Sequence, residues 1–74
     1  MGAQTVDVQE GGIRLGQFLK LAGIADSGAQ ARALLTDGEV SVNGEVEQRR
    51  GRQLTSGDEV VVALPAGEHR YRVG

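Results

Sequence analysis

The chain has 74 residues with eight Lys or Arg and ten Asp or Glu, so its formal net charge at pH 7 is -2. An acidic chain does not attract nucleic acid through its overall charge, and any such binding requires a local cluster of cations. Cysteine is absent, which excludes disulfides and thiolate metal sites and is typical of a reducing, cytoplasmic location.

The first part of the chain predicts a short strand followed by a helix. "TVDVQ" alternates apolar and polar residues, as a half-buried strand does. In "IRLGQFLKLAG" the apolar residues recur at helical spacing and predict one buried stripe. That stripe consists of Leu15, Phe18, Leu19 and Ala22. Gly23 suits the left-handed position just past a helix end, and Ile24 would then pack on Leu19.

The next segment, "DSGAQARALLTDG", predicts a second helix. Ser27 is a good N-cap, and Gln30 three residues later completes a capping box. Leu34 and Leu35 belong to the predicted buried stripe, and Gly38 ends the helix. Because only a few residues separate the two helices, we expect a compact helical hairpin.

From Glu39 onward the apolar period changes to two, which predicts strands. Asn43-Gly44 between two such segments is a strong signal for a hairpin turn. "TSGD" predicts a turn stabilised by Asp58, "EVVVAL" predicts the most buried strand, and "HRYRV" predicts a final edge strand. The chain is therefore expected to be a single α+β domain, residues 1–74, with a strand, a helical hairpin and a small antiparallel β-meander.

The sequence offers no catalytic constellation. His69 is the only histidine and has no second metal ligand in view, and Ser27 has no recognisable base. Neither glycine motif that cradles phosphates in nucleotide-binding proteins occurs. No apolar run approaches membrane-spanning length and no signal peptide is visible. We therefore predict a non-enzymatic domain with no cofactor, metal, small-molecule substrate or membrane partner.

The segment "QRRGRQ", residues 48–53, concentrates three of the eight basic residues, and no Asp or Glu lies between Gln48 and Gly57. Such a block is often only a solvated turn. Arginine forks, however, match phosphate oxygens, and further cations are expected on helix faces turned away from the core. Together they suggest a local phosphate-binding site on an acidic protein. The candidate residues are Lys20, Arg32, Arg49, Arg50 and Arg52.

Residues 13–62 resemble the S-four domain, an RNA-binding module named after a protein of the bacterial small ribosomal subunit. The resemblance is carried by Arg14-Leu15, by Ala31 with Leu34-Leu35, and by "DGEVSVNGEV" and "LTSGDEV". The segments "SGAQA" and "VNGEVEQRRGR" are similar to the corresponding sequences of the short, free-standing bacterial members of the YbcJ type. The resemblance implies the αL RNA-binding motif, in which two helices and a hairpin dock structured RNA chiefly through its backbone.

By this resemblance, Arg14, Lys20 and Arg32 would lie on the helical part of the RNA-binding surface. Arg49, Arg50 and Arg52 would lie beside it. The chain departs from the common family pattern at Gly16, where an acid is usual, and at Gly28, where an arginine is usual. Gly28 removes a basic contact from the RNA-binding surface, so the arginines of "QRRGRQ" become the more important candidates for RNA contact.

Two functions follow as hypotheses. The first is a small cytoplasmic protein that binds structured RNA, ribosomal or transfer RNA, through phosphate contacts that position it without reading sequence. The alternative is a protein-interaction adaptor without direct RNA contact, whose acidic residues bind a basic partner such as a ribosomal protein. Those acidic residues are Asp37, Glu39, Glu45 and Glu47.

Overall fold

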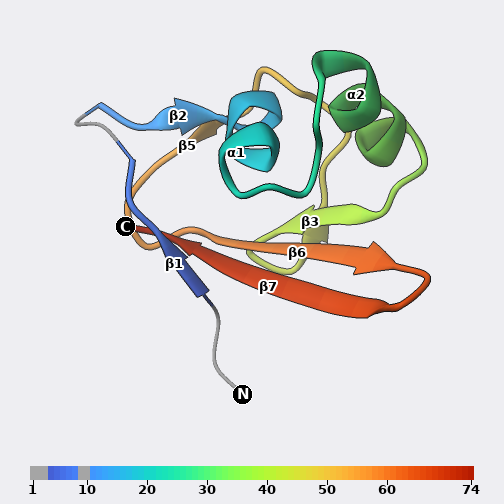
Figure 1. Cartoon of the computed structure of the whole chain (residues 1–74). Coiled ribbons are helices and arrows are strands. Elements are labelled where there is room, and N and C mark those ends of the chain that lie inside the picture. Colours follow the sequence, from blue (N-terminus) through green and yellow to red (C-terminus); the bar gives the residue numbers. More distant parts are fainter. Residues whose placement is uncertain (1–3, 9–10) are drawn as a thin grey trace.

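The computed structural model describes residues 4–8 and 11–74. Two helices lie on one face of a five-stranded sheet, and a small second sheet lies beside the first helix (Figure 1). This arrangement confirms the predicted α+β class. The elements are β1 (Gln4–Val6), β2 (Ile13–Arg14), α1 (Leu15–Leu21), α2 (Gly28–Thr36), β3 (Val40–Val42), β4 (Glu45–Val46), β5 (Gln53–Leu54), β6 (Glu59–Leu64) and β7 (Gly67–Val73).

The predicted end of α1 at Gly23 and the predicted N-cap of α2 at Ser27 are both present. At the end of α1, Gly23 has a φ of 80°, and the Ile24 N–H donates to the Leu19 carbonyl at 3.0 Å, which closes a Schellman motif. At the start of α2, the Ser27 hydroxyl accepts from the Gln30 N–H at 3.2 Å. The Gln30 side chain accepts from the N–H of Asp26 at 2.7 Å and not from that of Ser27, so only the Ser27 half of the predicted capping box forms as expected. These local contacts fix the length of each helix.

The large sheet has the strand order β1-β7-β6-β3-β4. Asn43 and Gly44 form the predicted two-residue turn between β3 and β4, with φ of 52° and 89°. The next long strand, β6, returns to pair with β3, and β7 then pairs with β6. Because β1 pairs in parallel with β7, β7 is an interior strand, and its predicted position at the sheet edge was wrong.

The core lies between the sheet and the helices and is mainly aliphatic. Its two rings, Phe18 and Tyr71, meet edge to face with centroids 6.3 Å apart. Leu35 is fully buried on α2, as predicted, whereas Leu34 is only half-buried at the border of the core. The expectation that both leucines are buried was therefore correct for Leu35 alone.

The small sheet joins two segments that are distant in sequence. In it, Ile13 pairs with Leu54 and Arg14 pairs with Gln53 in antiparallel register. Because of this pairing, the segment before β5, residues 47–52, lies next to the first turn of α1.

Within the described residues, no helix has the length and apolar character needed to cross a membrane.

Candidate nucleic-acid interface

Residues 47–52 form a loop between β4 and β5, here called the arginine loop, that is bonded to the start of α1. The N–H of Leu15 donates to the Arg52 carbonyl at 2.8 Å, and the N–H of Gly16 donates to the Arg50 carbonyl at 2.9 Å. Arg14, the N-cap residue, makes no side-chain cap, so the loop carbonyls satisfy these free N–H groups instead. A Cβ at Gly16 would lie 3.2 Å from the Cβ of Arg50, so glycine permits this close approach.

Glu47 is the buried acid at the base of the arginine loop, with a relative exposure of 7%. Its carboxylate accepts hydrogen bonds from the backbone N–H, Nε and Nη2 of Arg49, each at 3.1 Å. It also accepts from Nη1 of Arg52 at 3.1 Å. The bonds from Arg49, followed by the one from Arg52, lower the pKa of Glu47 from 4.5 to about 2. Glu47 is therefore ionised at neutral pH and bound to both arginines.

This cluster corrects the expectation that the arginine block lacks an acidic partner nearby in sequence. Glu47 immediately precedes the acid-free segment that runs from Gln48 to Gly57. The Arg49 side chain remains 78% exposed, but one edge of its guanidinium is bound to the carboxylate. Arg52 is only 32% exposed. The two arginines and Glu47 together carry a net charge of one, so the loop is less basic than its sequence suggests.

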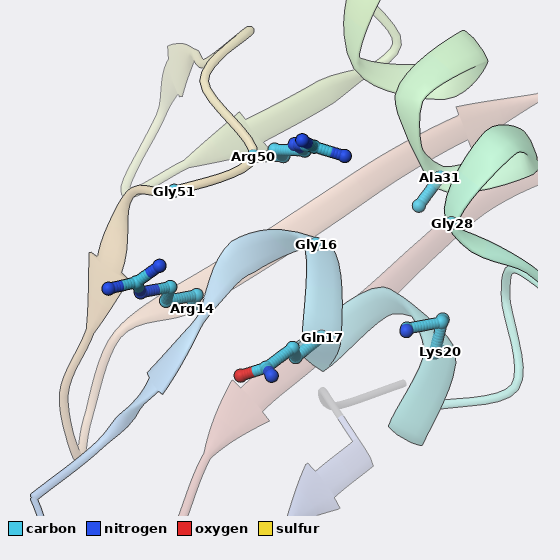
Figure 2. Close-up of a pocket in the computed structure, with 8 residues that line it drawn as sticks. All are labelled: Arg14, Gly16, Gln17, Lys20, Gly28, Ala31, Arg50 and Gly51. Atoms are coloured by element: carbon cyan, nitrogen blue, oxygen red, sulfur yellow. The ribbon is translucent and has the colours of Figure 1, made fainter.

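Arg50, the third arginine of the loop, lines an open hollow of about 280 Å³ together with Arg14 and Lys20. We call this the cationic hollow. In Figure 2, Arg50 extends from the loop toward the start of α2, and Lys20 projects from α1 below it. Arg14 lies on the other side of the loop, with its guanidinium directed toward β5. The remaining lining residues are Gly16, Gln17, Gly28, Ala31 and Gly51.

The charges of the cationic hollow are not neutralised by its neighbours. Arg14, Lys20 and Arg50 are all exposed. None of the three takes part in a salt bridge within the part of the chain that the structure describes. Three cations around small, mostly glycine residues leave room for an anion to approach closely. Such a surface fits a phosphate group better than a neutral ligand.

The sequence profile of the S4 domain matches residues 6–73. The chain belongs to the S4 domain family. A Bacillus subtilis protein named "Probable ribosome maturation protein RlbA" is 45% identical over 60 residues, which are 81% of this chain and 84% of that protein. The Escherichia coli protein named "Putative RNA-binding protein YbcJ" is 39% identical over 51 residues, which are 69% of this chain and 73% of that protein.

A solved structure has the same fold as this S4 domain. The solution structure of YbcJ from Escherichia coli, described as revealing an αL motif involved in RNA binding, superposes with a TM-score of 0.69. It is 32% identical in sequence, and the match covers 99% of this chain and 89% of that one. The family predicted from the motifs is therefore confirmed, as is the α+β fold with two helices on a sheet.

The remaining predicted site residue of the S4 domain, Arg32, lies on α2 and is exposed, but it does not line the cationic hollow. Sequence reasoning missed Gln17, which lies three residues before Lys20 on the same face of α1 and also lines the hollow. It also treated Gly16 and Gly28 only as departures from the family pattern. Helical spacing could have found Gln17, whereas the role of Gly16 depends on the position of the arginine loop.

The S4 domain presents no metal-ligand cluster of three or more His, Cys, Asp or Glu side chains in residues 4–8 and 11–74. Ser27 acts as the N-cap of α2. Asp58 accepts hydrogen bonds from Thr55 and from the Asn43 side chain, and the bond from the Thr55 N–H lowers the pKa of Asp58. These polar residues therefore have structural partners that account for them.

Proposed function

We propose that this S4 domain binds structured RNA by contacting backbone phosphates at the cationic hollow. The observation that carries the proposal is that Arg14, Lys20 and Arg50, from three different segments, all line one hollow in a protein of net charge -2. Arginine forks match phosphate oxygens bidentately, and lysine adds a point charge. A local cluster of this kind attracts a polyanion even where acids outnumber bases overall.

The mode of recognition follows from the residues that are exposed. Phosphate contacts carry no sequence information directly, so specificity would come from the shape of the RNA. Base stacking on Phe or Tyr is not expected, because the single Phe and the single Tyr of the chain are both buried in the core. The glycines around the hollow favour close approach of an RNA backbone. Arg32, exposed on α2, would extend the contact beyond the hollow.

We propose ribosomal RNA as the first candidate for the bound RNA. The support is the ribosome maturation function named for the Bacillus subtilis relative, which is 45% identical to this chain. Transfer RNA is the alternative structured RNA, and a ribosomal protein next to the binding site would be a secondary partner. Parallel binding assays with ribosomal RNA fragments and transfer RNA would separate these candidates.

The competing adaptor function uses the acidic residues near the β3–β4 hairpin. One of them, Glu47, is buried and bound to Arg49 and Arg52, so it is not free to meet a basic protein. This observation weakens the adaptor hypothesis relative to RNA binding. It leaves Asp37, Glu39 and Glu45 as the acidic surface that such a partner would need.

The test is the salt dependence of affinity for a fluorescently labelled stem-loop RNA. Each lost phosphate contact should flatten the slope of log affinity against log salt by about 0.7–0.9, because fewer counterions are released. The double variant Lys20→Gln/Arg50→Gln should therefore lose up to about 1.8 from that slope. Affinity should fall for every RNA tested.

The matched control is Arg70→Gln/Arg72→Gln. Both residues are exposed on β7. The alternate residues Tyr71 and Val73 are buried against the core, so Arg70 and Arg72 point to the opposite face of the sheet, away from the helices. The control changes the net charge by the same amount and should affect binding little. Equal losses in the two double variants would contradict a local site. Absence of wild-type binding at low salt, with binding to a basic protein instead, would favour the adaptor.

A further inference from the structure

We infer that Glu47 is a positioning residue for RNA binding, because its carboxylate fixes the arginine loop in the conformation that presents Arg50 at the cationic hollow. This inference rests on the proposed function of the hollow. It also assigns Arg49 and Arg52 a different role from that of Arg50: they bind Glu47 and hold the loop, whereas Arg50 faces the ligand.

Glu47 is well placed to fix the loop because it is itself anchored to the sheet. Its backbone N–H donates to the Val40 carbonyl of β3 at 2.9 Å. Its side chain is 9% exposed, so the carboxylate is largely withdrawn from solvent. Four hydrogen bonds converge on that carboxylate, including one from the backbone of Arg49. A charge-assisted network of this kind is stronger and more directional than neutral hydrogen bonds.

The network encloses a tight turn with Arg50 at its tip. The Arg52 N–H donates to the Arg49 carbonyl at 3.2 Å, so Arg50 and Gly51 are the two central residues of the turn. Both ends of this turn are bound to the Glu47 carboxylate: Arg49 through its N–H and its guanidinium, and Arg52 through its guanidinium. The far side of the turn is bonded to α1 through the carbonyls of Arg50 and Arg52. The turn is thus held between the carboxylate and the helix, and Arg50 extends from it toward α2 (Figure 2).

Removing the Glu47 carboxylate should change RNA affinity in opposite directions, depending on whether Glu47 acts only through its charge or by positioning Arg50. Glu47→Gln adds one positive charge to the protein and releases two arginines that could bind phosphate. Considered as electrostatics only, the variant should therefore bind RNA more tightly. If Glu47 positions Arg50, the variant should bind less tightly, because the loop loses its fixed conformation and Arg50 must be ordered when the RNA binds.

The first experiment measures the loop without RNA. In Glu47→Gln, hydrogen exchange of the Leu15 and Gly16 amides should accelerate by at least about tenfold, because both amides donate to loop carbonyls. The control is Glu45→Gln, an exposed acid on the neighbouring β4 that should leave both rates unchanged. Arg49→Gln, which keeps the carboxylate, should accelerate exchange less and serves if Glu47→Gln does not fold. Unchanged rates in these variants would overturn the inference.

The second experiment is a double-mutant cycle of RNA affinity with the same stem-loop RNA. Glu47→Gln should weaken binding by about three- to tenfold, which lies within the wider range of coupling between contacting residues. The same change should have no further effect in the Arg50→Gln protein, since Glu47 acts through Arg50. Tighter binding by Glu47→Gln, or effects that simply multiply, would contradict the positioning role. Failure of wild-type protein to bind would reject the proposed function, while the exchange rates would still decide whether Glu47 fixes the loop.

Discussion

At the scale of single residues, the β3–β4 turn shows how a backbone angle restricts sequence. Gly44 has a φ of 89°, a region that residues with a side chain rarely adopt. An added Cβ there meets no atom within 4 Å, so the strained backbone is the main cost of a substitution. Asn43, with a φ of 52°, also hydrogen-bonds Asp58 and the Glu59 N–H through its side chain. The turn is therefore linked to the start of β6.

We expect Gly44→Val to lower the free energy of unfolding by about 1–3 kcal/mol, the usual cost of a strained backbone position. Urea denaturation monitored by circular dichroism would measure it. Gly51→Val is the matched control, because Gly51 also has open space around it but is not among the residues with positive φ. Equal stability of Gly44→Val and wild type would contradict the turn geometry.

At the scale of elements, the features predicted from sequence are those whose partners lie nearby in the chain. The cap at Ser27, the helix end at Gly23 and the Asn43-Gly44 turn each depend on contacts within a few residues. The parallel pairing of β1 with β7 and the pairing of β2 with β5 join distant segments, and no local pattern specifies them.

The candidate site was predicted only in part, because its geometry also depends on the pairing of distant segments. Arg14, Lys20 and Arg50 were all candidates, but their grouping depends on the pairing of β2 with β5, which lies outside local pattern. The network of Glu47 with Arg49 and Arg52 was not predicted. Because of this network, replacing all three loop arginines at once would also destabilise the loop.

The first turn of α2 offers a test by gain of function. Gly28 lines the cationic hollow, and a Cβ added there meets no atom within 4 Å. Gly28→Arg should tighten RNA binding and steepen the salt slope by about 0.7–0.9, the value of one added phosphate contact. Stability should stay close to wild type. The gain in helix propensity of up to about 1 kcal/mol is offset by a cation near a helix N-terminus, which costs about 0.3–1 kcal/mol.

Ala29→Arg is the control for this gain. Ala29 is exposed on the same helix, one residue further along, and does not line the hollow. The two variants carry the same net charge, so a difference in RNA affinity between them reports where the guanidinium lies. A larger gain at position 28 would support the site. Equal gains would mean that overall charge, and not the hollow, governs RNA affinity.

At the scale of the whole molecule, acid stability depends on carboxylates that the fold keeps ionised. Because the folded-state pKa of Glu47 is about 2 against 4.5 for the free group, its contribution to stability is fully present above about pH 4.5. That contribution is lost as the pH falls from 4.5 toward 2, since the carboxyl must then be protonated in the folded protein. Asp58, whose pKa is also lowered, acts in the same direction.

We therefore expect wild-type protein to melt at a higher temperature than Glu47→Gln at pH 7, and this difference to shrink progressively between pH 4.5 and pH 2. Thermal melts across this range would measure it. Glu45→Gln, at an exposed position, should follow the wild-type curve closely. A difference between wild type and Glu47→Gln that is constant with pH would show that the Glu47 carboxylate does not contribute through its charge.

We propose that RNA binds at the cationic hollow, on the side of the helices and the arginine loop. The most direct measurement maps backbone amide chemical shifts of isotope-labelled protein as a stem-loop RNA is added. We expect the largest changes at residues that line the hollow, namely Arg14, Gly16, Lys20, Gly28 and Gly51. Amides of β6 and β7 on the opposite face should change little. Largest changes at Glu59, Arg70 and Arg72, or no changes at low salt, would contradict it.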